Sequence, residues 1–434
     1  MKIWKRILLI ENQTGLNSLF STKHQVKTHY HTHSKPQKFS QTLKSYLHSN
    51  SPTKALLLFT NLLKKDPSLI DSYSLLHIIK VCTKKALVTE GKQIHGIVIK
   101  FGGEPIIYLR TSLINMYSSW GNVGDAHQVF DEIPTKNVVC WTALISAYVD
   151  NKRAKEGFEL FREMVVGNVE PDQVTFTVAL SACAHVGALD MGEWVLDCIR
   201  RRRGMVVDLC LENALLNMYA KCGDIGSARR MFDGMIGRDV MTWTSMIVGY
   251  ALHGQAEEAL RLYAEMTADC GDGLRKKRRP SIVPNSVTFV GVLMACSHAG
   301  LVEEGKRHFK SMTDVYGLKV QLSHYGCMVD LLCRAGLLQE AYEFIMEMPK
   351  QTNAVVWRTL LGACSSSGNV ELAAIAHDHL RRLKKGLAGD DVAMSNVYAV
   401  TEMWDEKMMI RDQTKERRAP GCSSVVWHQS AFHC

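Results

Sequence analysis

The apolar residues in the middle of the chain recur with the spacing of amphipathic helices. Leu215, Met218, Tyr219 and Cys222 stand at i, i+3, i+4 and i+7, which places them on one face of a helix. The pattern breaks at Gly223, and the same spacing then starts again. The chain is therefore predicted to contain pairs of short amphipathic helices, each pair joined by a tight turn.

A longer period lies over this spacing. Identical residues stand 102 positions apart, as in the pairs Met116 and Met218, Phe130 and Phe232, Trp141 and Trp243, and Tyr148 and Tyr250. This distance is about three times 34, so a unit the size of one helix pair repeats inside the longer period. One pair cannot bury its apolar face alone, whereas stacked pairs can. We expect an all-α protein, a solenoid of about ten tandem helix pairs.

The composition agrees with an ordered helical chain. Of the 434 residues, 46% are hydrophobic, which is enough for a stacked core. No run of about eighteen apolar residues occurs, so we expect no membrane-spanning segment. The 13 cysteines are odd in number, scattered and never spaced C-x-x-C, which argues against a disulfide framework and indicates a reducing compartment.

The positive charge is concentrated in two segments. The formal net charge is +9, of which residues 1–35 contribute +5 and the run "RKKRR" at 275–279 contributes another +5. Subtracting both leaves −1 for the rest of the chain. Binding of nucleic acid by that part would have to rest on local patches and base contacts, because bulk attraction is lacking. The basic run is interpreted as part of a solvated surface insertion at about 268–282.

Three consecutive units show a further regularity. They are 35, 36 and 31 residues long, at 138–172, 173–208 and 209–239, and contain "NVVCWTALISAYV", "QVTFTVALSACAHVGALDMGEWV" and "NALLNMYAKCGDIGSARRMFD". In these motifs the chain resembles plant pentatricopeptide repeat (PPR) proteins of the class that alternates standard (P), long (L) and short (S) repeats. The resemblance covers roughly residues 36–428 and implies a right-handed α-solenoid.

The resemblance also divides the chain into regions. PPR repeats occupy residues 36–353. Residues 354–428, with "AVVWRTLLGACSSSGNVELAAIAHDHLRRL" and "APGCSSVVW", look like the E-type extension found behind the repeats of organellar RNA-editing factors, and residues 429–434 form a tail. The E-like region departs from the family's pattern at Ser424, where tryptophan is usual, and it is shortened around residues 391–396.

The first 35 residues are basic, rich in hydroxyl side chains and nearly free of acids, which is typical of an organelle transit peptide. Because Arg6 is their only arginine, the choice between mitochondrion and chloroplast stays open. We prefer mitochondrion, with chloroplast as the alternative organelle. An untargeted N-terminal tail is the other interpretation.

The resemblance implies that single-stranded RNA is the ligand. In this family one base is read per repeat, by a polar residue early in the first helix and by the last residue of the repeat. Thr142 lies off the apolar stripe, and Asn213 precedes the stripe and opens its helix, as such a role requires. The residues that match the two positions are Thr111 with Asn137, Thr142 with Asp172, Thr177 with Asp208, Asn213 with Asp239, and Thr244 with Asn285.

The hydrogen-bonding chemistry of the last residue suggests which base each repeat prefers. A carboxylate only accepts hydrogen bonds and suits G or U, whereas an amide both donates and accepts and suits A or C. By the family's code, a small hydroxyl at the first position goes with purines and Asn goes with pyrimidines. The five pairs therefore predict a preference for A-G-N-U-A, read 5′ to 3′ as the repeats run from the N-terminus.

The same residues also allow a purely structural interpretation. Asn and Asp before a helix commonly cap it, by accepting hydrogen bonds from the free N–H groups of the first turn. Capping and base contact can coexist at one side chain. Both interpretations are kept open at this point.

The chain lacks the motifs of a cytidine deaminase. That reaction needs a His-x-Glu and a Cys-x-x-Cys around a zinc-bound water, and the sequence contains neither. We expect no catalytic residue, no metal site, no cofactor and no enzyme activity. The resemblance implies a site-recognition factor for C-to-U RNA editing in an organelle, which recruits a separate DYW-type deaminase and other editing factors.

Two alternatives remain for the function. One is an organellar RNA-binding factor that acts in splicing, stability or translation. The other is a protein-interaction scaffold, since tetratricopeptide repeats have the same helix-pair architecture. The oligomeric state is left open.

Overall fold

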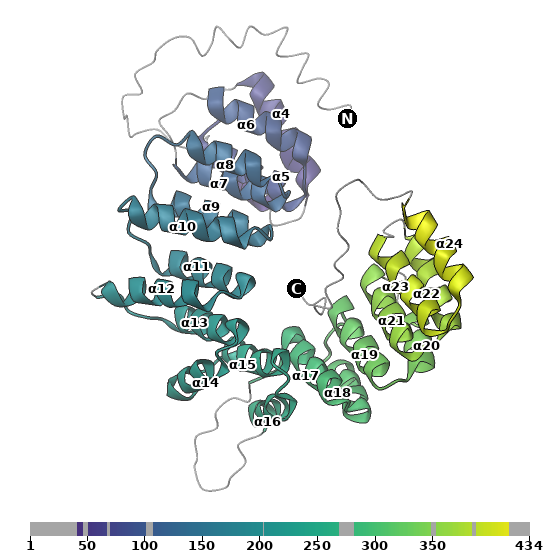
Figure 1. The fold of residues 1–434 in the computed structure, drawn as a ribbon. Helices are drawn as coiled ribbons and strands as arrows, with labels where there is room; N and C mark the ends of the chain where they lie inside the picture. The colour runs from purple at the N-terminus through teal and green to yellow at the C-terminus, as the bar shows by residue number, and fades with distance from the viewer. Residues whose placement is uncertain are drawn as a thin grey trace. The chain divides into compact units, whose positions relative to one another are not determined.

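The computed structural model describes residues 41–46, 51–66, 70–100, 107–202, 204–268, 282–348, 353–383 and 388–415. Across these residues every regular element is an α-helix. The helices form two compact units, Met1–Met218 and Tyr219–Cys434 (Figure 1).

The first unit contains a short helical stretch at residues 41–46 and a series of longer helices. These are α4 (Pro52–Lys65), α5 (Ser72–Lys84), α6 (Val88–Lys100), α7 (Ile107–Ser119), α8 (Val123–Asp131), α9 (Val138–Asp150), α10 (Ala154–Val166), α11 (Gln173–Val186) and α12 (Leu189–Arg201). Helix α13 (Leu209–Cys222) begins in the first unit and ends in the second.

The second unit continues with helices of the same length. They are α14 (Ile225–Gly234), α15 (Val240–Leu252), α16 (Ala256–Thr267), α17 (Ser286–Ala299), α18 (Val302–Asp314), α19 (Leu322–Arg334), α20 (Leu338–Met346), α21 (Ala354–Ser367), α22 (Val370–Arg382), α23 (Ala388–Val400) and α24 (Trp404–Lys415).

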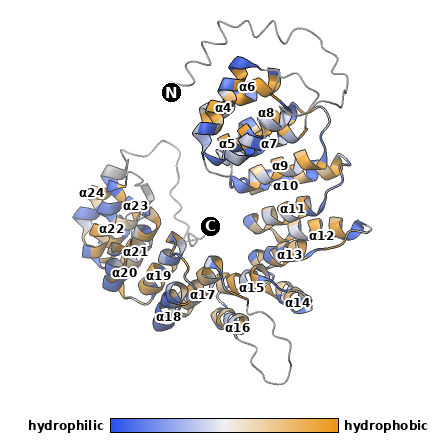
Figure 2. Cartoon of the chain, turned by 180° about the vertical axis from the view of Figure 1, so that it is seen from behind, coloured by the Kyte–Doolittle hydropathy of each residue, from blue (hydrophilic) through white to orange (hydrophobic). Residues whose placement is uncertain are grey.

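Each unit is a stack of helix pairs. In the first unit, the N-terminal helices of successive pairs contact one another, α5 with α7, α7 with α9 and α9 with α11. In the second unit, the first helices α15, α17, α19, α21 and α23 form such a series, each contacting the one before it from α17 onward. The second helices α6, α8, α10, α16, α18, α20 and α22 each pack against their own first helix and against the first helix of the following pair. Polar and apolar residues alternate around the helices of both units, as amphipathic helices require (Figure 2).

Local sequence signals set the helix ends. Helix α11 begins after Asp172, whose side chain accepts a hydrogen bond from the Thr175 N–H, and it ends at Gly187 with φ of 74°. Helix α17 begins after Asn285 and ends at Gly300 with φ of 68°. Glycine adopts this left-handed conformation without a steric penalty, so these two glycines end α11 and α17 cleanly.

Aromatic pairs recur in the core at the period read from the sequence. The Phe130 and Trp141 rings pack edge to face with centroids 4.8 Å apart. Phe232 and Trp243 repeat the arrangement in the second unit at 5.0 Å. In each case the last turn of a short second helix meets the first turn of the next pair, which closes the stack between successive repeats.

Helices α6, α12 and α18 each carry a glycine where a side chain of the following helix pair lies close. A Cβ at Gly91 would lie 2.1 Å from the Trp120 ring. A Cβ at Gly192 would lie 2.3 Å from the Met218 sulfur, and one at Gly305 would lie 2.3 Å from Leu331 Cδ2. The absence of a side chain at these three positions therefore lets the following helix pair pack closely.

The predicted all-α stack of tandem helix pairs is confirmed. No described helix combines the length and the apolar character needed to span a bilayer. The described cysteines form no disulfide, and burial raises the pKa of Cys82, Cys296 and Cys333 to about 12, so these thiols act as small apolar core groups. The predicted N-terminal segment at 1–35, most of the insertion at 268–282 and the tail at 429–434 lie outside the described residues.

Candidate nucleic-acid interface

The five residues predicted to end a repeat all cap the next helix. Each side chain accepts a hydrogen bond from the backbone N–H three residues later: Asn137 from Cys140 at 3.1 Å, Asp172 from Thr175 at 2.8 Å, Asp208 from Leu211 at 2.9 Å, Asp239 from Thr242 at 2.9 Å, and Asn285 from Thr288 at 2.9 Å. The structural interpretation of these residues is therefore correct for all five.

Capping uses only one of the two polar atoms at the tip of each side chain. The cap bonds go to Oδ1 in every case. Among the described residues, the second oxygen of Asp172 and Asp208 and the amide nitrogen of Asn137 and Asn285 have no protein partner. A second hydrogen bond to a ligand is therefore compatible with capping at these four positions.

The residues predicted for the first helix all occupy its fifth position. Thr111, Thr142 and Thr177 are half-buried, and each Oγ1 lies 2.8–2.9 Å from the carbonyl oxygen four residues earlier. Asn213 is also half-buried, but it does not open its helix as expected, because α13 already begins at Leu209. The cap at Asp208 moves the start of α13 toward the N-terminus by one turn.

Thr244 differs from the other fifth-position residues. It is 4% exposed, and its Oγ1 lies 2.7 Å from Thr288 Oγ1. Met241, three residues earlier on α15, is 53% exposed, so at this position the apolar residue and not the threonine is open to solvent.

The structure brings together the two members of a predicted pair although they lie at opposite ends of a repeat. Thr142 Oγ1 lies 2.7 Å from Thr175 Oγ1, which in turn lies 2.7 Å from Asp172 Oδ1. Thr244 and Asn285 are linked in the same way through Thr288. Thr111 and Asn137 meet at Cys140, whose Sγ lies 3.8 Å from the Thr111 hydroxyl. Between Thr177 and Asp208 the corresponding residue is Leu211, which offers no polar side chain.

A row of exposed apolar residues accompanies the polar ones and was missed from the sequence. It occupies the second position of the first helices, three residues before the fifth position, so both lie on one face of the helix. In the first unit the rings of two successive members, Tyr73 and Tyr108, stack with centroids 6.1 Å apart. The row consists of Tyr73, Tyr108, Val139, Val174, Met241 and Val287, which are 41–60% exposed.

The sequence pattern of apolar and polar positions contained a signal for this exposed apolar row. These residues are apolar and yet fall outside the i, i+3, i+4 stripe that forms the core. Recurrence of an apolar residue at a fixed, off-stripe position in successive repeats indicates a surface role that packing does not explain.

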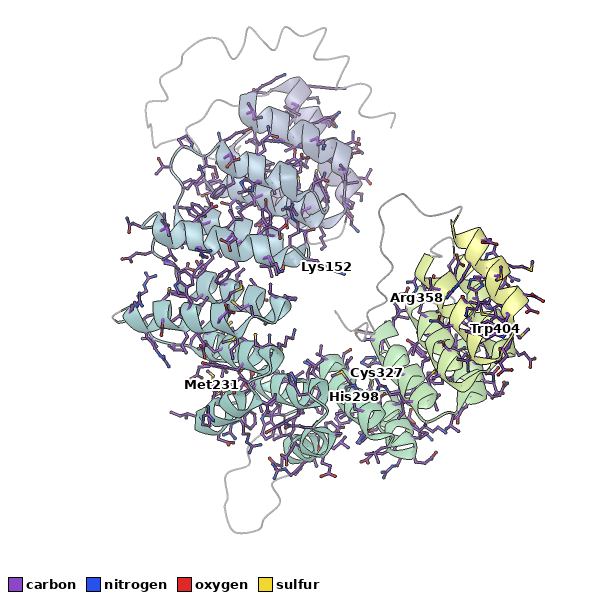
Figure 3. The ribbon with its side chains drawn as sticks, viewed as in Figure 1. Lys152, Met231, His298, Cys327, Arg358 and Trp404 are labelled. Carbon is purple, nitrogen blue, oxygen red and sulfur yellow. The ribbon has the colours of Figure 1, made fainter. Side chains whose placement is uncertain are left out.

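The last helix pairs place a different chemistry at the same position. The fifth residue of α21 is Arg358 (Figure 3). It donates two hydrogen bonds to Asp390, at 2.7 and 3.0 Å. Asp390 is 5% exposed, and its neighbour Asp391 lies 2.8 Å from His377 Nε2. Here the fifth residue is engaged in a largely buried ion pair.

Comparisons with known proteins agree with this geometry. The PPR repeat model matches residues 109–138, 213–240, 241–270, 287–314 and 323–351, and the PPR repeat family model matches residues 136–185. The Arabidopsis thaliana pentatricopeptide repeat-containing protein At2g20540 is 32% identical over 422 residues, which cover 89% of this chain and 77% of that protein. The Arabidopsis protein At1g59720, described as chloroplastic/mitochondrial, is 36% identical over 384 residues, or 86% of this chain and 59% of that protein.

One solved structure shows the same fold. It is the pentatricopeptide repeat protein PPR10 in complex with an 18-nt psaJ RNA element, with a TM-score of 0.50, 16% identity, and coverage of 87% of this chain and 60% of that one. The stacked helix pairs with one capped first helix per pair define a helical-repeat protein. Together with its Arabidopsis relatives, this shows that the chain belongs to the pentatricopeptide repeat family. It spans 48–64% of the length of three of these relatives.

Proposed function

We propose that this chain binds single-stranded RNA and selects bases through successive repeats. One observation carries the proposal: Asp172 and Asn285, which cap α11 and α17, each keep a second polar atom. Each is linked through a buried threonine to the fifth-position threonine of its repeat, which lies three residues after an exposed apolar residue. A base needs these two kinds of contact, hydrogen bonds to its edge and an apolar surface against its face. PPR10, which has the same fold, was solved with RNA bound.

The cap geometry sharpens the expected base preferences. Asn285 Oδ1 accepts two hydrogen bonds within the protein and Asn137 Oδ1 accepts one, whereas both NH₂ groups stay available to donate to the ring nitrogen of A or C. Asp172 and Asp208 each have an oxygen left, which accepts from the ring N–H of G or U. The preference A-G-N-U-A, with the reading pairs Thr111/Asn137, Thr142/Asp172, Asn213/Asp239 and Thr244/Asn285, is kept as the proposal.

The apolar row supplies the second contact. Val139 and Val174 occupy the same position on neighbouring first helices and are 50% and 60% exposed. A base lying near Thr142 would place its faces against such side chains, which is favourable for any base and therefore contributes affinity rather than selectivity. Selectivity would come from the polar pair.

For the biological role we propose site recognition in organellar C-to-U RNA editing, with a DYW-type deaminase recruited in trans. The sequence resemblance of residues 354–428 to the E-type extension supports this role. An organelle is further supported by relatives described as chloroplastic or chloroplastic/mitochondrial, and mitochondrion stays our preferred compartment. An RNA factor for splicing, stability or translation is the alternative.

A binding measurement tests the molecular part of the proposal. The purified protein is titrated against a labelled single-stranded RNA that contains A-G-N-U-A, with unlabelled competitor RNA present. We expect tighter binding than to a probe in which C replaces G, by about tenfold, the value of one good base-specific contact. Equal binding to both probes would remove the base assignment, and no binding to either would favour a protein-interaction scaffold.

A second measurement addresses the biological role. Organelle transcripts from plants with and without this chain are compared at every edited cytidine. Loss of editing at one or a few sites, with normal splicing and transcript levels, is the expected result. Normal editing with altered splicing or transcript levels would instead support the alternative.

A further inference from the structure

A buried threonine of the next repeat joins the two reading residues of the repeat before it. Thr175 is the third residue of α11 and is fully buried. Its Oγ1 lies 2.7 Å from Thr142 Oγ1 and 2.7 Å from Asp172 Oδ1. The two residues of the predicted reading pair, Thr142 and Asp172, are therefore connected through the hydroxyl group of Thr175, a third residue.

The number of hydroxyl protons at Thr142 and Thr175 limits which of their hydrogen bonds can form together. Thr142 and Thr175 have one hydroxyl proton each, and three bonds compete for them: Thr175 to Asp172, the Thr142–Thr175 contact, and Thr142 to the Val138 carbonyl at 2.8 Å. A carboxylate is the strongest of these acceptors. If Thr175 donates to Asp172, Thr142 must donate to Thr175, and the Thr142 oxygen is left to accept from a ligand.

The equivalent site in the second unit has a weaker acceptor. There Thr288 Oγ1 lies 3.1 Å from the Asn285 amide oxygen and 2.7 Å from Thr244 Oγ1. Because a neutral amide holds the proton less strongly than a carboxylate, Thr288 is freer to donate to Thr244. The last residue of a repeat thus influences the hydrogen-bonding direction of the fifth.

We propose that the third residue of a first helix, where it carries a hydroxyl group, is a positioning residue that sets whether the fifth residue of the preceding repeat accepts or donates a hydrogen bond. This inference rests on the proposed RNA binding. At the Thr142/Asp172 site, Thr175 turns the Thr142 oxygen into an acceptor beside the remaining Asp172 oxygen. Two adjacent acceptors match the N1–H and N2–H₂ donors on the edge of guanine. Uracil has a single ring N–H, and adenine has an acceptor at N1.

In two other repeats, the third residue of the next first helix has a side chain without a hydroxyl group. Thr177 is followed by Leu211 at the third position of the next first helix, and its hydroxyl contacts only the Gln173 carbonyl within the described residues. No relay sets its direction, and this is the repeat for which the predicted motif names no base. Thr111 is followed by Cys140, whose Sγ at 3.8 Å makes a weak relay.

The test compares Thr175→Val with Thr175→Ser in binding to A-G-N-U-A and to the same RNA with A in place of G. Thr175→Val keeps the backbone N–H that Asp172 accepts but lacks the hydroxyl. We expect it to lower the G-over-A preference about fivefold, the value of one hydrogen bond, and Thr175→Ser to retain it. The matched control Thr288→Val removes the equivalent hydroxyl in the second unit and should leave the preference at G unchanged.

A gain-of-function variant keeps the inference testable if Thr175→Val does not fold. Cys140→Thr places a hydroxyl at the third position beside Thr111 and should increase selectivity for the first base of the motif. Unchanged G-over-A preference in a folded, RNA-binding Thr175→Val protein would overturn the inference alone, as would unchanged first-base selectivity in Cys140→Thr. Absence of RNA binding by the unmutated protein would instead overturn the proposed function and the inference with it.

Discussion

The α9–α11 repeat and the α21–α23 helix pairs use one fold position for two purposes. In α9 the fifth residue, Thr142, meets the third residue of the next first helix, Thr175, through hydroxyl groups that retain hydrogen-bonding capacity. In α21 the fifth residue, Arg358, meets the third residue of α23, Asp390, through a bidentate ion pair. Helix-pair geometry alone therefore does not make a repeat a reader of bases.

The difference lies in what each pair leaves available. Thr142 and Asp172 keep acceptor atoms beside exposed Val139, whereas Arg358 and Asp390 satisfy each other. The side chain of Asp390 is 7% exposed, so an RNA base could reach it only after the ion pair opened. This ion pair is expected to stabilise the C-terminal helix pairs, and the proposed base reading would not extend to α21.

The largest expected effect comes from breaking that ion pair. Arg358→Ala leaves the Asp390 carboxylate buried without its charge partner and should cost about 3 kcal/mol of unfolding free energy. Urea denaturation, combined with hydrogen exchange in α21–α23, measures it. The control is Arg334→Ala, which removes an exposed pair with Asp330 and should cost under about 1 kcal/mol. An equal loss of unfolding free energy in the two variants would contradict the inference that the Arg358–Asp390 ion pair stabilises the C-terminal helix pairs.

The next effect concerns close packing between repeats and has a control in the same helix. Gly91→Ala on α6 would place a methyl group 2.1 Å from the Trp120 ring and should destabilise the first unit by about 2 kcal/mol. Gly96→Ala, also on α6, meets no atom within 4 Å and should stabilise the helix by about 0.5–1 kcal/mol. Thermal denaturation of both variants gives the comparison. A tolerated Gly91→Ala would show that Trp120 can move aside.

Changing the reading pair should alter RNA selectivity more than stability. Thr142→Asn together with Asp172→Asn keeps an N-cap but replaces the acceptors, so we expect roughly tenfold weaker binding to A-G-N-U-A and loss of the preference for G. Ser146→Ala, one turn further along α9, should leave both unchanged. Fluorescence anisotropy with G- and C-containing probes checks this, and a retained preference for G would place the reading elsewhere.

The smallest effect is a pH dependence of stability at α19. His324 is fully buried, it accepts a hydrogen bond from the Gln321 N–H at Nδ1, and its Nε2 lies 2.8 Å from the Ser286 carbonyl oxygen. Burial lowers its pKa from 6.5, so the stability it contributes is present above about pH 6.5 and is lost as the pH falls through its folded pKa. His324→Thr, which installs the residue found at this position in α11 and α17, should reduce the fall in melting temperature between pH 7 and pH 5. An unchanged pH profile would assign the acid sensitivity to His95 and His308, whose pKa values burial also lowers.

The sequence by itself determined the all-α class, the period, the helix-pair unit and the capping alternative for Asn137, Asp172, Asp208, Asp239 and Asn285. These features are local: apolar spacing selects the helix, and Asn or Asp before it satisfies the first-turn N–H groups. Because the same local pattern recurs at a fixed period, it predicts similar helix pairs in successive parts of the chain. The resemblance to pentatricopeptide repeat proteins predicted the base-reading positions without any geometry, and these stay a prediction.

Only the tertiary structure decided which groups meet across a repeat boundary. Thr142 and Thr175 are 33 positions apart, and their 2.7 Å contact depends on how α9 and α11 pack. The same holds for the exposure of Val139, the burial of Thr244 and the Arg358–Asp390 pair. Apolar spacing tells which face of a helix is buried, but the hydrogen-bond partner of a polar atom depends on the distance and direction to a neighbouring helix, which no local pattern encodes.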